Sequence, residues 1–217
     1  MSSKKRPCLL IGSGGHARVV LSILKEESNK IHDVIGILDL QTPKKNEKYL
    51  DASVIDNVDA MEQFCGTVPD IFLSIGDNAI RKKYFELGKS LGFIFPNLIS
   101  EKAFISPEVI LGQGNLICHN AYIGCGASVG DNNILNTSSI LEHESCIGNH
   151  CHLAPASVIC GRSRIDDQVF VGAGATIVDY IKIISNTVIG AGAVVVKDIE
   201  TPFMVHMGVP AEQIERL

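Results

Sequence analysis

An aliphatic residue recurs at every sixth position through the second half of the chain. Small residues mostly stand four positions after each aliphatic residue, and glycine often follows it directly. The sixteen aliphatic positions are Ile105, Leu111, Ile117, Ile123, Val129, Leu135, Leu141, Ile147, Leu153, Ile159, Ile165, Val171, Ile177, Ile183, Ile189 and Val195. A period of six fits neither a 3.6-residue helix nor simple strand alternation, and it is typical of a β-helix whose coil has three six-residue sides. The pattern predicts about five stacked coils with the aliphatic side chains pointing inward.

The first half of the chain alternates short apolar runs with helical patterns. Strands are predicted at residues 8–11, 34–38, 71–75 and 93–95, and helices at 18–27, at 56–64 and from Asp77 or Asn78 to about Leu91. Such βα alternation predicts a parallel, Rossmann-like α/β sheet. We therefore expect two domains, a Rossmann-like domain over residues 1–99 and a β-helix with a C-terminal cap over residues 100–217.

A glycine-rich turn links the first predicted strand to the first predicted helix. Its residues are Gly12, Ser13, Gly14, Gly15, His16 and Ala17. Backbone N–H groups at such a helix start cradle phosphates, although a tight turn alone would also explain the glycines. Asp39 ends the second strand about 20 residues later, where an acid meets a ribose hydroxyl, and Gly76 ends the third. The unit is too short for a full dinucleotide fold, so a nucleotide sugar is favoured over NAD.

Composition and charge exclude several classes of protein. Apolar residues make up 46% of the chain and charged residues 20%, which excludes general disorder. The net charge of −5 gives no electrostatic case for binding nucleic acid or an anionic membrane surface. No apolar run approaches the ~20 residues of a membrane helix, and no export signal is expected. Seven cysteines without a CxxC pair favour reduced thiols and a cytoplasmic location.

The string Glu142-His143-Glu144 is the strongest candidate for chemistry. His143 stands two residues after an inward-facing leucine, which places it at a corner of the prism and outside the core. Imidazole titrates near neutral pH and suits a general base, and Glu144 could hold the ring and stabilise the imidazolium. An exposed histidine without a function is the alternative. Because one coil takes eighteen residues, Gly161 should stack above His143 and could offer its N–H to a carbonyl oxygen.

Together these features resemble the PglD/NeuD type of sugar acetyltransferase, within the hexapeptide-repeat acyltransferase superfamily. The resemblance rests on the GSGGHA turn, the hexads, the E-H-E string and the closing Gly208-Val209-Pro210-Ala211, and it covers nearly the whole chain. It implies that the β-helix is left-handed. It also implies a homotrimer with active sites between neighbouring prisms.

The resemblance further implies roles for individual residues. His143 is then the catalytic base and Glu144 its acidic partner. The implied acetyl-CoA contacts are His152, Gly161, Ala173, Gly174, Ala191 and Gly192. The implied contacts with the nucleotide sugar are Gly12, Ser13, Gly14, Gly15, His16, Asp39, Gly76, Asn78, Arg81 and Asn136. Each group has a plainer explanation: a surface histidine for His152, tight corners for the small residues, and a helix cap and surface charge for Asn78 and Arg81.

The implied reaction is acetyl transfer from acetyl-CoA to the 4-amino group of a 4-amino-4,6-dideoxy sugar linked to a nucleotide, with UDP favoured. The amine would attack the thioester directly and no metal would take part, as a bacterial cytoplasmic step of glycan biosynthesis. A sialic acid O-acetyltransferase shares the architecture and is one alternative. A zinc hydratase or a non-catalytic β-helix binding module is another. Zinc needs three or four ligands in tetrahedral reach, and the spacing of His119, His143, His150 and His152 does not favour this.

Overall fold

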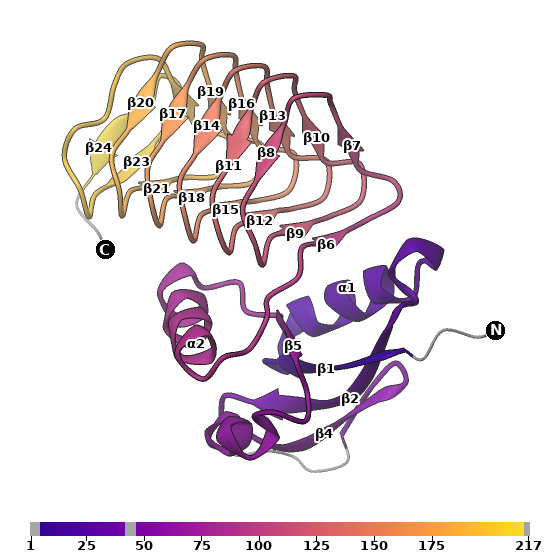
Figure 1. Ribbon diagram of the computed structural model, residues 1–217. Coiled ribbons are helices and arrows are strands. Elements are labelled where there is room, and N and C mark those ends of the chain that lie inside the picture. Colours follow the sequence, from indigo (N-terminus) through magenta and orange to yellow (C-terminus); the bar gives the residue numbers. More distant parts are fainter. Residues whose placement is uncertain (1–4, 42–46, 215–217) are drawn as a thin grey trace. The chain divides into compact units, whose positions relative to one another are not determined.

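The chain divides into two compact units, Met1–Glu101 and Lys102–Leu217. The computed structural model describes residues 5–41 and 47–214. The first unit is an α/β unit and the second is a stack of coils, which Figure 1 shows in purple and in magenta to yellow. The predicted fold class is confirmed: a Rossmann-like domain precedes a left-handed parallel β-helix.

The first unit is built on one sheet with the strand order β3-β4-β2-β1-β5. Its strands are β1 (Arg6–Ile11), β2 (His32–Asp39), β3 (Lys48–Tyr49), β4 (Ala52–Asn57) and β5 (Asp70–Leu73). Its helices are α1 (Gly15–Leu24), α2 (Asn78–Ser90) and two 3₁₀ helices, Glu27–Asn29 and Val58–Phe64. Strands β4, β2, β1 and β5 are parallel, and β3 pairs antiparallel with β4. Their carboxyl ends therefore meet at one edge, where ligands bind in open α/β sheets.

Two predictions for this unit are wrong. The predicted helix over residues 56–64 begins inside strand β4, and only Val58–Phe64 is helical, as a 3₁₀ helix. The predicted strand over residues 93–95 is a single bridge between Ile94 and Asp70. Phe93 and Phe95 are buried in the core, and Phe95 packs against Phe85 with ring centroids 4.6 Å apart. Burial of these two rings, rather than strand pairing, explains the apolar run.

The second unit has three faces of short parallel strands. The first face consists of β7 (Phe104–Ile105), β10 (Tyr122–Ile123), β13 (Ile140–Leu141), β16 (Val158–Ile159), β19 (Thr176–Ile177) and β22 (Val194–Val195). The second consists of β8 (Ile110–Leu111), β11 (Ser128–Val129), β14 (Cys146–Ile147), β17 (Arg164–Ile165) and β20 (Lys182–Ile183). Within this unit, the third consists of β9 (Leu116–Ile117), β12 (Ile134–Leu135), β15 (His152–Leu153), β18 (Phe170–Val171), β21 (Val188–Ile189), β23 (Val205–Met207) and β24 (Glu212–Ile214). Strand β6 (Leu98–Ile99) precedes them, and β24 closes the stack by pairing antiparallel with β23.

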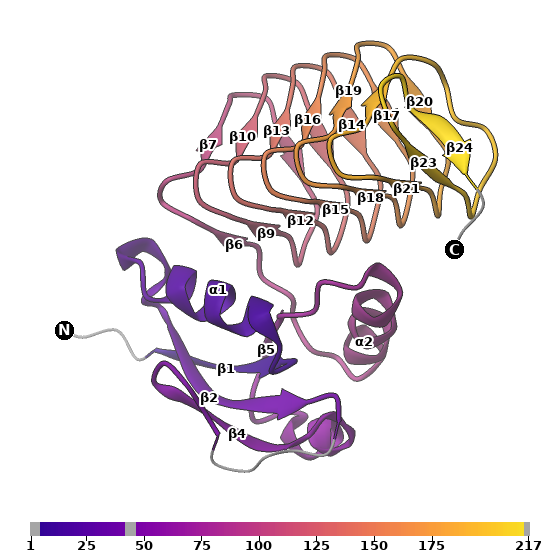
Figure 2. The same ribbon diagram turned by 180° about the vertical axis from the view of Figure 1, so that it is seen from behind.

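The register of the coils is eighteen residues from β7 to β22, and it shortens to seventeen where Val188 on β21 pairs with Val205 on β23. Ile140 pairs with Val158, and Val158 pairs with Thr176. The aliphatic position of each strand points inward, as at Leu141 and Ile159, which are fully buried. Residues eighteen apart therefore lie above one another along the stack that Figure 2 shows from behind. This register decides which side chains can meet outside the prism.

Candidate active site

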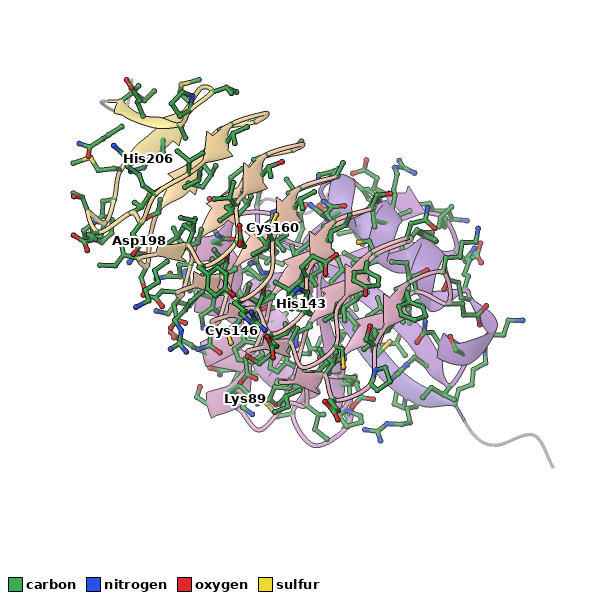
Figure 3. The ribbon with its side chains drawn as sticks, turned by 90° about the horizontal axis from the view of Figure 1, so that it is seen from above. Lys89, His143, Cys146, Cys160, Asp198 and His206 are labelled. Carbon is green, nitrogen blue, oxygen red and sulfur yellow. The ribbon has the colours of Figure 1, made fainter. Side chains whose placement is uncertain are left out.

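His143 and Glu144 form the turn between β13 and β14, at the corner between the first and second faces. Glu144 has a φ of 57°, a left-handed backbone conformation that makes the corner tight. Both side chains are 54% exposed. In Figure 3 His143 lies among the middle coils, well away from His206 near the C-terminal end of the stack. The corner thus presents an accessible imidazole beside a carboxylate.

The carboxylate of Glu144 links His143 to the next coil. Its Oε2 lies 3.7 Å from His143 Nδ1 and accepts a hydrogen bond from Nε of Arg162. The hydrogen bond and then the charge of Arg162 hold the pKa of Glu144 below its ordinary value, with a smaller contribution from His143. Glu144 is therefore a carboxylate at neutral pH and can stabilise a proton on the imidazole.

Gly161 lies against the imidazole of His143. A Cβ atom added at Gly161 would lie 2.6 Å from His143 Cε1 and 2.7 Å from Nε2, so the imidazole would have to move to make room for it. The ring thus occupies the space that only a glycine leaves open. In the part of the chain that the structure describes, the Gly161 N–H donates to no protein group, whereas the His143 N–H donates to Glu142 Oε2 at 3.1 Å. The Gly161 N–H thus has no acceptor among these residues, and Gly161 itself is buried next to the imidazole.

A cysteine next to this corner does not have the properties of a nucleophile. Burial raises the pKa of the Cys160 thiol, and the carboxylates of Asp179 and Glu142 raise it further. A thiol held protonated is a weak nucleophile. Cys160 therefore gives no support for an acyl-enzyme intermediate.

A second corner of the prism carries a ladder of small, exposed residues. Ala173, Gly174, Ala191 and Gly192 lie between the third and first faces, and the Gly192 N–H donates to Ala173 O at 2.9 Å. Cβ atoms added at Gly174 or Gly192 would meet nothing within 4 Å. This surface is open and smooth, but it is a different corner from the one that carries His143.

His152 and Asn136 lie together on the third face. His152, on β15, is buried, and its Nε2 lies 3.2 Å from Asn136 Nδ2. The ring of Phe170 packs edge-on against it at 5.2 Å. His152 is therefore not the exposed surface histidine that was its plainer explanation. The prism places His152 and His143 half a coil apart, on different sides.

In the first unit, a cleft of about 500 Å³ lies at the carboxyl edge of the sheet. Seven of the predicted contacts line it: Gly12, Ser13, Gly14, Gly15, His16, Asp39 and Gly76. Helix α1 begins at Gly15 with Gly14 as its N-cap, three residues before the predicted start, so its first N–H groups belong to the glycine turn. The turn needs a glycine at position 12, where φ is 103° and a Cβ atom would approach Ser74 O to 3.2 Å. The edge can therefore hold an anionic group by its backbone.

Two predicted contacts form the wall behind this cleft. The Arg81 side chain is buried and donates to the carbonyl oxygens of Ile75 and Gly76 at 3.2 and 3.1 Å and to Asn78 Oδ1 at 2.9 Å. Arg81 is therefore not a surface charge. Burial and the Arg81 charge lower the pKa of His16, which keeps its ring neutral at pH 7. The N-cap of α2 is Asp77, whose carboxylate accepts from the Ile80 N–H at 2.8 Å.

Sequence reasoning missed several side chains at the two sites. Gln41, Glu47, Tyr49, Ser74 and Asp77 also line the cleft. Tyr49 comes from the small β3–β4 hairpin, for which the sequence carried no turn signal that we used. Arg162 was missed although it stands one coil after Glu144, the same spacing that pointed to Gly161.

Two features are absent from residues 5–41 and 47–214, a cluster of metal ligands and a membrane-spanning helix. No group of three or more His, Cys, Asp or Glu side chains is placed to hold a metal ion within residues 5–41 and 47–214. Over the same residues, no helix has the length and apolarity needed to cross a membrane.

Comparisons with known proteins agree with both units. The PglD N-terminal domain family matches residues 8–87. PerB from Caulobacter crescentus, solved with CoA and GDP-perosamine, is 31% identical over 96% of this chain and 97% of its own, with a TM-score of 0.89. The acetyltransferase domain of PglB from Neisseria gonorrhoeae is 29% identical over 97% of this chain and 100% of its own, with a TM-score of 0.87.

A curated viral protein matches only in part. The uncharacterized protein L142 of Acanthamoeba polyphaga mimivirus is 32% identical over 106 residues, 49% of this chain. This chain spans about a fifth of its length, 20% of the viral protein. The full-length match to PerB and the hexad prism decide the family. The chain belongs to the PglD/NeuD type of sugar acetyltransferases, which are acyltransferases of the hexapeptide-repeat superfamily.

Proposed function

We propose that this chain transfers the acetyl group of acetyl-CoA to the 4-amino group of a nucleotide-linked 4-amino-4,6-dideoxy sugar, with His143 as the general base. Acetyl-CoA is its co-substrate, as CoA and acetyl-CoA bound to the related PerB and PglB structures support. The observation that carries the proposal is the open corner at which His143 lies between the Glu144 carboxylate and the Gly161 backbone. A base, its acidic partner and a backbone N–H donor stand there together.

The chemistry follows from these positions. Neutral His143 takes a proton from the acceptor ammonium, and Glu144 stabilises the imidazolium that forms. The free amine attacks the thioester carbonyl carbon, and the negative charge on oxygen is met by the Gly161 N–H. The nitrogen of the tetrahedral intermediate then releases its extra proton to water. When the intermediate collapses, the carbon–sulfur bond breaks, and the CoA thiolate leaves and takes the proton held by His143. The amide product and free CoA leave, and the base is neutral again.

The nucleotide sugar is proposed to bind in the cleft of the first unit. The diphosphate would take the N–H groups of the glycine turn, and Asp39, at the end of β2, would accept from a ribose hydroxyl. A neutral His16 can donate or accept a hydrogen bond there, and it carries no charge that would attract or repel the diphosphate. The family resemblance favours UDP as the nucleotide, whereas the related PerB was solved with GDP-perosamine.

Acetyl-CoA is proposed to lie along the small-residue ladder of a neighbouring copy of the chain. Ala173 and Ala191 offer an exposed, narrow track for the pantetheine arm, but one prism places them on a different corner from His143. A homotrimer in which prisms stand side by side would bring the ladder of one copy to the base of the next. His152 and Asn136, on the third face, would then border the thioester and the sugar.

The test of the function is release of CoA thiol from acetyl-CoA, followed by mass spectrometry of the acceptor. UDP-, GDP- and dTDP-4-amino-4,6-dideoxy sugars and sialic acid are offered in parallel. We expect CoA release and an acetyl-sized mass gain on an amino sugar. Acetylation of sialic acid alone would instead establish an O-acetyltransferase, and no turnover with any acceptor would contradict the proposal.

Complementation between two inactive variants tests the shared site. We expect His143→Ala and Ala173→Tyr each to be inactive alone, because one lacks the base and the other blocks the exposed track. Co-expression of the two should restore roughly a quarter of the activity, since random mixing in a cyclic trimer leaves that share of sites with both halves intact. Co-expression of His143→Ala with Gly161→Val is the control, because both changes affect one corner. Absence of restored activity would place both halves within one subunit.

A further inference from the structure

Arg162 is the middle residue of a column of three corner residues on successive coils, and the first of them, Glu144, follows the proposed base directly in the sequence. Glu144, Arg162 and Tyr180 stand eighteen residues apart and share left-handed φ values of 57°, 61° and 63°. Because that backbone conformation repeats at the same corner, the three side chains leave the prism above one another. They form a continuous chain of contacts outside the core.

Each contact in this column has a defined direction. Arg162 donates from Nε to Glu144 Oε2 and from Nη1 to the Tyr180 hydroxyl oxygen. Its guanidinium also lies over the Tyr180 ring, 5.6 Å from the centroid. The oxygen that Arg162 holds is the same Oε2 that lies 3.7 Å from His143 Nδ1. The carboxylate is thus fixed from above and cannot turn from His143 without breaking the bond with Arg162.

We propose that Arg162 is a positioning residue for the acyl transfer, which holds Glu144 against His143 and is itself held by Tyr180. The inference rests on the proposed role of His143. The Arg162 backbone N–H donates to the His143 carbonyl oxygen at 3.0 Å, a bond that a change of side chain leaves in place. The hydrogen bonds of its side chain go to Glu144 and Tyr180, so the side chain acts on the base through Glu144. Its planar guanidinium suits this task better than an ammonium, since its N–H donors are fixed in direction.

Other charged groups around the corner set the electrostatic background. Glu142 accepts from the His143 N–H, and Glu108, two coils below Glu144, lies 3.8 Å from Cys125 Sγ. Asp179 lies two coils above His143, next to Tyr180 in the sequence. These carboxylates surround the corner with negative charge, and Arg162 is the cation that contacts Glu144 directly. Its removal therefore leaves the Glu144 charge uncompensated beside the base.

Removing the cation should lower the rate and move its pH dependence. For Arg162→Gln we expect kcat to fall about tenfold, because Glu144 loses its fixed orientation, with the KM for acetyl-CoA within about twofold. The acid limb of the kcat profile should move to higher pH, because an uncompensated carboxylate favours the protonated, inactive base. Glu144→Gln should move the same limb to lower pH.

Matched variants separate positioning from folding. Arg162→Lys keeps the charge and should return the acid limb toward that of the wild type while kcat stays reduced. Arg164→Gln, an exposed arginine on β17, should leave kcat and the pH profile unchanged. Thermal unfolding checks that each variant is folded.

The outcomes distinguish this inference from the proposed function. A wild-type kcat and pH profile in Arg162→Gln, with His143→Ala inactive, would overturn the positioning role alone. Full activity in His143→Ala would overturn the role of His143 and this inference with it. A reduced kcat with an unmoved acid limb would show a structural role only and would also overturn the inference.

Discussion

Replacement of His143 by alanine is expected to lower kcat by a factor of about 10²–10⁴, the usual contribution of a general base. The acceptor amine is largely an ammonium ion at neutral pH, and His143 is the group proposed to remove its proton. The side chain is 54% exposed and lies outside the core, so its removal should not affect the fold. Steady-state kinetics with a saturating acceptor, together with thermal unfolding, measure both effects.

The pH profile gives this variant a sharper readout. In the wild type the rate is limited at low pH by protonation of the base and of the acceptor. In His143→Ala only the acceptor remains, so the rate should continue to rise with pH until the amine itself is deprotonated. Turnover within about threefold of the wild type at neutral pH would exclude His143 as the base.

The prism could be predicted almost completely from the sequence, and the reason is physical. Each coil buries one aliphatic side chain per face. An aliphatic residue at the repeating position, such as Leu141 or Ile159, is therefore recognised from the sequence as one that points inward. The coil length then fixes which residues stack. That arithmetic places Gly161 against His143, where the structure has it. The position of the glycine turn at the carboxyl edge of the first sheet followed similarly, because the turn stands between a strand and a helix in the sequence.

Other features depend on contacts that no local pattern encodes. Strand β4 was not predicted, because its only large aliphatic residues, Val54 and Ile55, stand side by side and give no alternation in the sequence, and Val58–Phe64 follows it without a break. Arg81 was read partly as surface charge, although its guanidinium is buried against the carbonyl oxygens of Ile75 and Gly76. The eighteen-residue spacing predicts that Arg162 stacks on Glu144. The hydrogen bond between them depends on side-chain rotamers, which the spacing does not give.

Gly161→Val is the second substitution for which we expect a large effect. The Cβ atom would lie 2.6 Å from His143 Cε1 and 2.7 Å from Nε2, so the imidazole must leave its place beside the glycine. Because the ring is exposed, it can rotate into solvent. The substitution should therefore displace the catalytic base without destabilising the fold. A base displaced by about 1 Å loses roughly 10²-fold in rate, so kcat should fall by about that factor.

The valine should also affect acetyl-CoA. Its branches would cover the Gly161 N–H, which donates to no protein group among the described residues and is proposed to meet the thioester oxygen. We therefore expect the KM for acetyl-CoA to rise severalfold in addition to the loss of kcat. Arg164→Gln, at an exposed position of β17, is the control, because it changes the surface of the same coil without filling space beside the imidazole. If Gly161→Val kept both constants of the wild type, neither the displacement of His143 nor the role of the N–H could stand.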